Sequence, residues 1–202
     1  MNCVFTDDQL GGRQEEVRAA AALLFFDNGY KGTSLKQIAN ALGLQAPSLY
    51  NHIKSKQQLL QDIMLDGTLN LINDHDLAVA QTDDPLEKIH MAARAHIRHA
   101  ARRRILAHVS MSELASVEEP AKSELTRLRI DYTLKWRSLI QVAVAAGSCA
   151  TSHPTLTAMT IIDLGASVAR SYDPDGKMSE DEVVDFYSEQ ALRLCGANTK
   201  TP

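Results

Sequence analysis

The segment from Asn28 to Gln61 carries positive charge in a chain that is acidic overall. It holds four lysines and no Asp or Glu, whereas the whole chain of 202 residues has a formal net charge of −4. The lysines are Lys31, Lys36, Lys54 and Lys56. Contacts with DNA phosphates require such a local cluster of ammonium groups. The segment is therefore a candidate nucleic-acid surface, while the negative net charge argues against a protein that coats nucleic acid without selectivity.

A second concentration of cationic side chains lies between positions 94 and 104. It consists of Arg94, Arg98, Arg102, Arg103 and Arg104. Guanidinium groups bind phosphates through paired hydrogen bonds, so this cluster could receive an anionic ligand. The same spacing fits cations that stabilise the C-terminal end of a helix, together with surface ion pairs, and composition alone favours that structural interpretation.

The histidines and cysteines provide no clear metal or catalytic site. His96 and His99 are three residues apart and could share a helix face, but no Cys or carboxylate joins them at ligand spacing. The cysteines, Cys3, Cys149 and Cys195, are too widely spaced for a zinc finger or a disulfide framework. We find no Ser/His/Asp ordering and no Gly-rich phosphate loop. We therefore expect no metal, no cofactor and no enzyme.

Composition indicates an ordinary globular protein. Hydrophobic residues make up 45% of the chain and charged residues 23%. No apolar run approaches the roughly 20 residues that cross a bilayer. Asp7 and Asp8 stand where a signal peptide would carry positive charge. We expect a cytoplasmic protein without a membrane partner.

Three short helices are predicted near the N-terminus. The first covers 14–28 and ends at Gly29, and the second is capped by Thr33 or Ser34 and closed by Gly43. The third covers 44–52, with Pro47 in its first turn. Two short helices joined through a glycine between leucines describe a helix-turn-helix.

Helical periodicity continues to the C-terminus, and no alternating strand pattern interrupts it. A long helix begins at Ser55 and fades near Asp76, and Asp84 caps the next one, which runs to about position 101. Further helices are predicted at 103–115, 120–146, 155–170 and 180–194, the last with Ser179 as its cap. We predict an all-α fold of about nine helices with three parts: a flexible arm (1–12), a helix-turn-helix domain (13–55) and an effector-binding and dimerisation domain (56–202).

The N-terminal region strongly resembles the DNA-binding domain of the tetracycline-repressor (TetR) family. The resemblance is carried over about fifty residues by Phe26, Gly29-Tyr30, Thr33-Ser34, Ile38-Ala39, Leu42-Gly43-Leu44, Ser48-Leu49-Tyr50, His52 and Ser55-Lys56. Ile53 stands where the family usually has Phe, an exchange of one core hydrophobe for another. The resemblance implies that 45–51 is a recognition helix in the major groove.

The same resemblance implies the DNA contacts. Gln45, Ala46 and Ser48 would face base edges, and the Gln45 amide suits adenine because it can form two hydrogen bonds to that base. The other implied contacts, mostly to phosphates, are Thr33, Ser34, Tyr50, Asn51, His52, Lys54 and Lys56. A two-fold homodimer would set its two recognition helices about 34 to 36 Å apart or somewhat wider, and would require a palindromic operator on double-stranded DNA.

The C-terminal region resembles TetR members that sense acyl-CoA thioesters. The run 169–179, Glu182-Val183 and Phe186-Tyr187 carry this resemblance, together with Arg104, Glu113, Arg129 and Tyr132, although the subgroup usually has an aromatic residue where Ser171 stands. It implies a ligand site at Arg98, Arg103, Arg104, Arg129, Trp136 and Arg170, with arginines on the CoA phosphates. Family resemblance also implies that the last two helices form a dimer interface through Ile161, Leu164, Gly165, Val168, Val183 and Phe186.

The sequence thus favours a repressor that a small hydrophobic effector, with acyl-CoA as one candidate, releases from its operator. Several alternatives stay open: an activator, a sensor of a drug, free fatty acid or metal, a helical acyl-thioester enzyme, and a structural helical adaptor. The last two helices could also simply close the protomer core.

Overall fold

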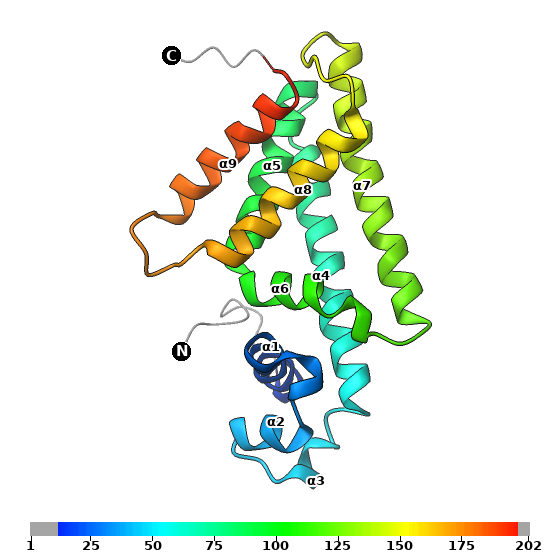
Figure 1. The fold of residues 1–202 in the computed structure, drawn as a ribbon, viewed down its shortest axis with the longest axis vertical. Helices are drawn as coiled ribbons and strands as arrows, with labels where there is room; N and C mark the ends of the chain where they lie inside the picture. Colours follow the sequence, from blue (N-terminus) through cyan, green and yellow to red (C-terminus); the bar gives the residue numbers. More distant parts are fainter. Residues whose placement is uncertain (1–11, 198–202) are drawn as a thin grey trace. The chain divides into compact units, whose positions relative to one another are not determined.

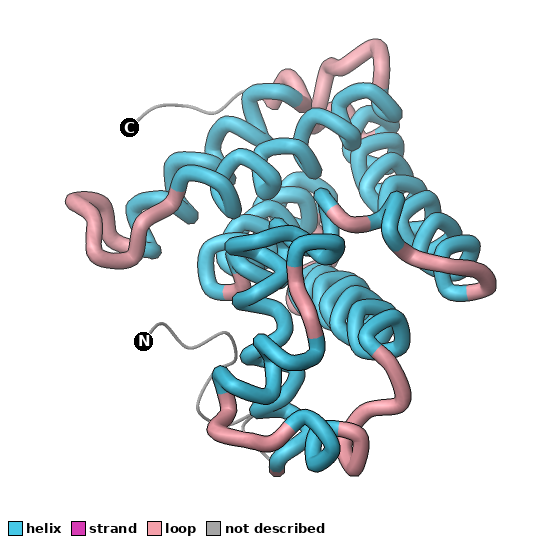
Figure 2. The backbone as a smooth tube through the Cα atoms, turned by 60° about the horizontal axis from the view of Figure 1, so that its bottom comes forward, coloured by secondary structure: helices cyan, strands magenta, loops and turns pink. Residues whose placement is uncertain are grey.

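The computed structural model describes residues 12–197, and all regular structure in this range is helical (Figure 1; Figure 2). The absence of strands from these residues and their nine α-helices confirm the predicted fold class. The elements are α1 (Arg13–Gly32), α2 (Leu35–Ala41), α3 (Ala46–Leu49), α4 (Lys56–Val79), α5 (Pro85–Arg102), α6 (Arg104–Ser112), the 3-10 turn η2 (Leu114–Ser116), α7 (Ala121–Ala145), α8 (Pro154–Ser171) and α9 (Glu180–Leu194). The predicted arm, 1–12, lies outside the described residues except for Gly12. None of the described helices is long and apolar enough to cross a membrane.

The three helix starts predicted from capping residues are confirmed, because these side chains make the expected bonds. Ser34 caps α2 and Ser179 caps α9, each in a reciprocal capping box with Gln37 or Glu182 three residues on. The Asp84 carboxylate accepts the N–H of the third residue of α5 at 2.8 Å. Each cap satisfies a backbone donor that the first turn of a helix leaves unpaired.

The first and third helices end differently from the prediction. The stop predicted at Gly29 occurs as a break inside α1, where Gly29 has φ 71° and ψ 161° and the chain turns helical again for three residues. The third helix is shorter than the predicted range 44–52. After Leu49 the amides of Asn51 and His52 bond carbonyls only three residues back, which is the tighter geometry of a turn.

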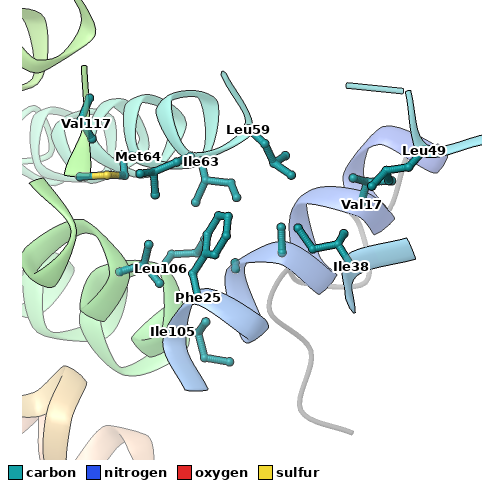
Figure 3. Packing of buried hydrophobic residues seen from close by; sticks show 14 of the residues in the cluster. Val17, Phe25, Ile38, Leu49, Leu59, Ile63, Met64, Ile105, Leu106 and Val117 are labelled. Carbon is teal, nitrogen blue, oxygen red and sulfur yellow. The ribbon is translucent and has the colours of Figure 1, made fainter. Parts of the chain in front are cut away.

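The described part of the first compact unit comprises residues 12–68 together with Ile105–Thr126. α1 supplies the centre of its core, and the Phe25 ring lies among Ile63 of α4 and Ile105 and Leu106 of α6 (Figure 3). Ile38 and Leu49 bring α2 and α3 onto the same core. The helix-turn-helix is therefore packed on the first half of α4 and on α6 by one continuous apolar cluster.

The described part of the second unit comprises Leu69–Arg104 and residues 127–197. Here α5 packs against α8 and α9 (Figure 1). Trp136, Ile140 and Ile161 are among the fully buried side chains of its core. The domain limits expected from the sequence, 13–55 and 56–202, stay a prediction.

Candidate functional site

α2 and α3 are joined by a tight turn that fixes which side chains α3 exposes. Gly43 has φ 65°, and the amides of Leu42 and Leu44 both bond the Ala39 carbonyl, at 3.1 and 2.9 Å. A residue with a side chain adopts this left-handed conformation only at a cost, so glycine suits the turn. The buried Leu49 anchors α3 to the core. The remaining positions of α3 and of the turn after it are left to face outward.

Most of the side chains expected to contact DNA are accessible. Tyr50 is 58% exposed, a large fraction for an aromatic side chain. Ala46, Ser48 and His52 are partly buried. The exposed members of the set are Ser34, Gln45, Tyr50, Asn51 and Lys54. The Ser34 hydroxyl is already used as the cap of α2.

Thr33 and Lys56 are instead held inside the first unit. Thr33 is 2% exposed, and its hydroxyl lies 3.0 Å from the Leu24 carbonyl and 2.9 Å from that of Gly29. The Lys56 ammonium donates to the carbonyls of Tyr30 and Thr33, both at 2.8 Å, and lies 4.1 Å from the centre of the Tyr30 ring. These bonds tie the turn between α1 and α2 to the start of α4.

A hollow of about 290 Å³ opens beside the exposed side chain of Lys54. Its lining includes Arg18 of α1 together with His52 and Lys54. Arg18 also pairs with Asp66 at 2.5 Å, so its charge is shared with a carboxylate. Arg18 was not expected at the site, because the fold brings it there from a separate segment and nothing in its own surroundings in the sequence marks it.

The arginines of α5 pair with the acidic first turns of α9. Arg98 bonds Glu180 at 3.1 Å and Asp181 at 2.7 Å, and Arg102 bonds Glu180 at 2.9 Å. Arg94 pairs with Asp185. Arginines spaced four residues apart form a stripe on one helix face, and this stripe is matched by the carboxylates of α9. Surface ion pairs, the structural interpretation of the arginine cluster, are therefore present for these three residues.

The other side chains expected at a ligand site have varied environments. Arg103 and Arg104 are partly buried where α5 passes into α6, and Arg170 is exposed at the end of α8. On α7, burial lowers the pKa of the partly buried Arg129, and Trp136 is completely buried.

Trp136 belongs to a buried group of polar aromatic residues in the second unit. His75, His96 and Tyr132 surround it, with ring centres 5.3 to 6.4 Å from the indole. His96 lies 3.1 Å from the Ile162 carbonyl and 3.0 Å from the Tyr132 hydroxyl. Burial lowers the pKa of His96 to about 4 and also lowers that of His75. Both rings are thus uncharged at neutral pH.

His99 lies next to this buried group and pairs with Asp74, with 2.7 Å between its Nδ1 and the carboxylate. Within residues 12–197 no cluster of three or more His, Cys, Asp or Glu side chains is arranged to hold a metal ion. The two histidines that could have shared a metal, His96 and His99, instead bond to protein groups.

The residues expected at a dimer interface are divided between the core and the surface. Ile161, Val168 and Val183 are buried within the protomer, Leu164 is partly buried, and Phe186 is 53% exposed. Leu156, Met159 and Leu194 add further exposed apolar side chains on α8 and α9.

Gly165, also expected at the interface, faces α5 of its own protomer. A Cβ atom at this position would lie 2.2 Å from His96 Nε2. The absence of a side chain at Gly165 thus allows α8 to approach α5 closely.

Two protein families match this chain, and together they cover most of it. Residues 17–63 match the family described as bacterial regulatory proteins, tetR family. Residues 82–195 match the family described as tetracyclin repressor-like, C-terminal domain. The first match covers the helix-turn-helix, and the second runs from just before α5 to the residue after α9.

Individual proteins resemble the chain over nearly its full length. The HTH-type transcriptional repressor KstR2 of Mycolicibacterium smegmatis is 27% identical over 184 residues, which are 90% of each chain. A bacterial regulatory protein in the tetR family from Rhodococcus RHA1 has a similar structure, with a TM-score of 0.84 and 25% identity over 91% of this chain and 97% of the other. AibR, solved with isovaleryl coenzyme A and operator DNA, shares the fold with a TM-score of 0.80 at 23% identity, over 92% of this chain and all of AibR.

Proposed function

The chain belongs to the tetR family of DNA-binding regulators, and on that basis we propose that it is a repressor that a small hydrophobic effector releases from a palindromic operator. The observation that carries the proposal is the exposed face of α3 and of the turn after it. This face presents Gln45, Tyr50, Asn51 and Lys54 in a segment without a carboxylate. Such a protein would work in the cytoplasm, where chromosomal DNA lies.

We propose different roles for the side chains of this face. Exposed Gln45, with Ala46 and Ser48 beside it, would read base edges, because an amide at the start of a recognition helix can distinguish adenine. Tyr50, Asn51, His52 and Lys54 would bind phosphates. Ser34, Thr33 and Lys56 would hold the turn before α2, with the remaining N–H of Lys56 available to a phosphate.

Binding to a palindrome requires two copies, and we propose that α8 and α9 supply the contact between them. Leu156, Met159, Phe186 and Leu194 are exposed apolar side chains on these two helices. Leu164 would join them, while Ile161, Gly165, Val168 and Val183 would support the interface from within each protomer. A dimer in light scattering that Phe186→Asp converts to monomers would support this interface.

The effector class that we propose is an acyl-CoA thioester. The arginines at the end of α5 could bind the CoA phosphates, and AibR, which has the same fold, was solved with such a thioester. Carboxylates of α9 already pair with Arg98 and Arg102, so the effector would have to compete for these two side chains. Arg103, Arg104, Arg129 and Arg170 are the other arginines that we propose for this site. Trp136 would then support the pocket from the core instead of lining it.

We expect Gln45→Ala to change which operators the protein prefers, because the mutation removes the base-reading amide and leaves the phosphate contacts. Each good bidentate base contact is worth about 1 to 3 kcal/mol, so discrimination at one base pair should fall by about fivefold or more. Anisotropy titrations with the operator and single-base variants at one salt concentration measure this. Lys54→Ala is the matched control and should weaken binding to all of these duplexes equally. An unchanged ranking of operators in Gln45→Ala would remove this residue from the base-reading set.

We expect Arg103→Ala to leave operator affinity within about twofold and to raise the thioester concentration that releases DNA by about tenfold, the value of one charge-assisted hydrogen bond. The release is titrated with isovaleryl-CoA on preformed protein–operator complexes. Arg193→Ala is the control, since this exposed residue on α9 pairs with its helical neighbour Glu189. Equal release from both variants and from the unaltered protein would exclude Arg103 from the effector site.

The first experiment is operator binding by fluorescence anisotropy, with DNA from upstream of the protein's own gene, at fixed salt, with and without acyl-CoA thioesters. Specific binding that a thioester releases supports both halves of the proposal. Binding that is indifferent to every thioester leaves a regulator with another effector, and tighter binding with a thioester would indicate an effector that promotes DNA binding. Hydrolysis of a thioester would favour the enzyme alternative.

A further inference from the structure

Tyr30 lies at the break in α1 and is bonded to several segments of the first unit. Its carbonyl accepts from Lys56, and its hydroxyl lies 2.7 Å from the Gln57 side-chain amide, so two neighbouring residues of α4 hold it. The Tyr30 ring packs edge-on against Phe25, with 5.4 Å between ring centres. Four residues later Ser34 caps the start of α2. The position of Tyr30 therefore determines where the chain leaves α1 and enters the turn before α2.

The backbone N–H of Tyr30 is bonded by Glu113, which comes from a distant part of the sequence. Because Gly29 leaves the helical conformation, the regular ladder of α1 is interrupted at this point. Glu113 Oε1 accepts the Tyr30 N–H at 3.0 Å, and the other carboxylate oxygen accepts from the Ser116 hydroxyl at 2.8 Å. A charged acceptor makes a stronger bond than a carbonyl, and an unpaired buried N–H is costly.

Other contacts hold the segment of Glu113 to the same end of α1. His108 of α6 packs edge-on against Phe26, with 4.8 Å between ring centres. With its amide nitrogen towards Tyr30, the Gln57 side chain also reaches the Ser116 carbonyl and the Glu118 N–H. Residues 104–116 are at the same time part of the covalent link between α5 and α7. A displacement of this link would thus act directly on the turn before α2.

We propose that Glu113 is a positioning residue for DNA binding, which fixes the orientation of α2 and α3 by holding Tyr30. This inference rests on the proposed function, since an orientation matters only to a protein that binds an operator. The proposal also predicts whether operator affinity rises or falls when the charge of Glu113 is removed. Removing a negative charge near DNA should strengthen binding by electrostatics, whereas loss of orientation should weaken it.

The test compares Glu113→Ala, Glu113→Gln and Asp27→Asn. Asp27 is exposed and lies on α1 three residues before Tyr30, so Asp27→Asn removes the same charge without touching the Tyr30 N–H. We expect Glu113→Ala to weaken operator binding at least about fivefold. Glu113→Gln, which keeps a neutral acceptor, should restore most of the affinity, and Asp27→Asn should bind as tightly as the unaltered protein or more tightly. A Glu113→Ala variant that binds like Asp27→Asn would overturn the proposal.

Hydrogen exchange measured by mass spectrometry distinguishes a positioning role of Glu113 from general destabilisation of the first unit. It also tests this role independently of whether the protein binds an operator. In free Glu113→Ala protein, the amides from Tyr30 to Leu42 should exchange faster, and those from Val17 to Phe25 should not change. Equal acceleration in both stretches would mean that Glu113 only stabilises the unit, and no acceleration in either would mean that it does not hold the turn. Both results would overturn the positioning role even if the unaltered protein bound no operator.

Discussion

Gly165→Ala is expected to destabilise the second unit by about 2 to 4 kcal/mol, although alanine is the better helix former. The added Cβ would lie 2.2 Å from His96 Nε2 and 2.9 Å from two of its ring carbons. His96 is fully enclosed, and its ring nitrogens bond the Ile162 carbonyl and the Tyr132 hydroxyl. Overpacking costs about 1 to 3 kcal/mol, and each buried bond that is broken adds about 1 to 3 more. These costs exceed the gain of about 1 kcal/mol in helix propensity.

The measurement is urea unfolding followed by the fluorescence of Trp136, the only tryptophan of the chain, which lies in this core. Gly67→Ala is the matched control. Its Cβ would meet only the Ser110 hydroxyl at 3.6 Å, an ordinary contact, so we expect it to stabilise the protein by up to about 1 kcal/mol. In a His96→Ala background Gly165→Ala should lose most of its cost, because the clashing ring is absent. Unfolding of Gly165→Ala at or above the unaltered midpoint would contradict the close approach of α8 to α5.

Local sequence signals predicted the helices well, because the chemistry that starts and ends a helix lies within a few residues. Asp84 followed by Pro85, and Ser179 followed by Glu182, indicate helix starts without knowledge of the rest of the chain. Gly29 predicted a stop, and its positive φ breaks α1 at that residue. The third helix was predicted too long, since an apolar period cannot distinguish one helical turn from the tighter turns that follow Leu49.

Contacts between distant residues could not be predicted in this way. His96 and Ile162 are 66 residues apart, and Tyr30 and Glu113 are 83 apart. The arginine stripe shows the limit most clearly. Its four-residue spacing is visible in the sequence, but the spacing does not reveal whether phosphates or the carboxylates of α9 face it. The side chains expected to contact DNA all lie within one segment of 24 residues, 33–56, so a local pattern is enough to propose them.

The buried histidines also imply that the protein loses stability in mild acid. Burial lowers the pKa of His96 from 6.5 to about 4, so the unfolded chain binds a proton at this residue at pH values where the folded chain does not. The free energy of unfolding therefore falls as the pH drops from about 6.5 towards 4, and this contribution is fully present only above 6.5. For His96 alone the loss is about 2 kcal/mol between neutral pH and pH 5. The pKa of His75 is lowered in the same direction by burial, so its contribution adds to this loss.

Urea unfolding from pH 7.5 to 5.0 at constant salt, again followed by Trp136, measures this dependence. This range lies above the ordinary pKa of carboxylates, so the ion pairs of Asp76 with Lys135 and of the α9 carboxylates with arginines should largely persist. His96→Asn lowers stability at every pH, so the informative quantity is the slope of the free energy of unfolding against pH. This slope should decrease by the contribution of His96. His90→Asn, at a partly exposed position on α5, is the control for removing a histidine outside this buried group. A slope in His96→Asn as steep as that of the unaltered protein would mean that His96 binds a proton as readily in the folded as in the unfolded state, and the same result would weaken the case for a ring held rigidly against Gly165.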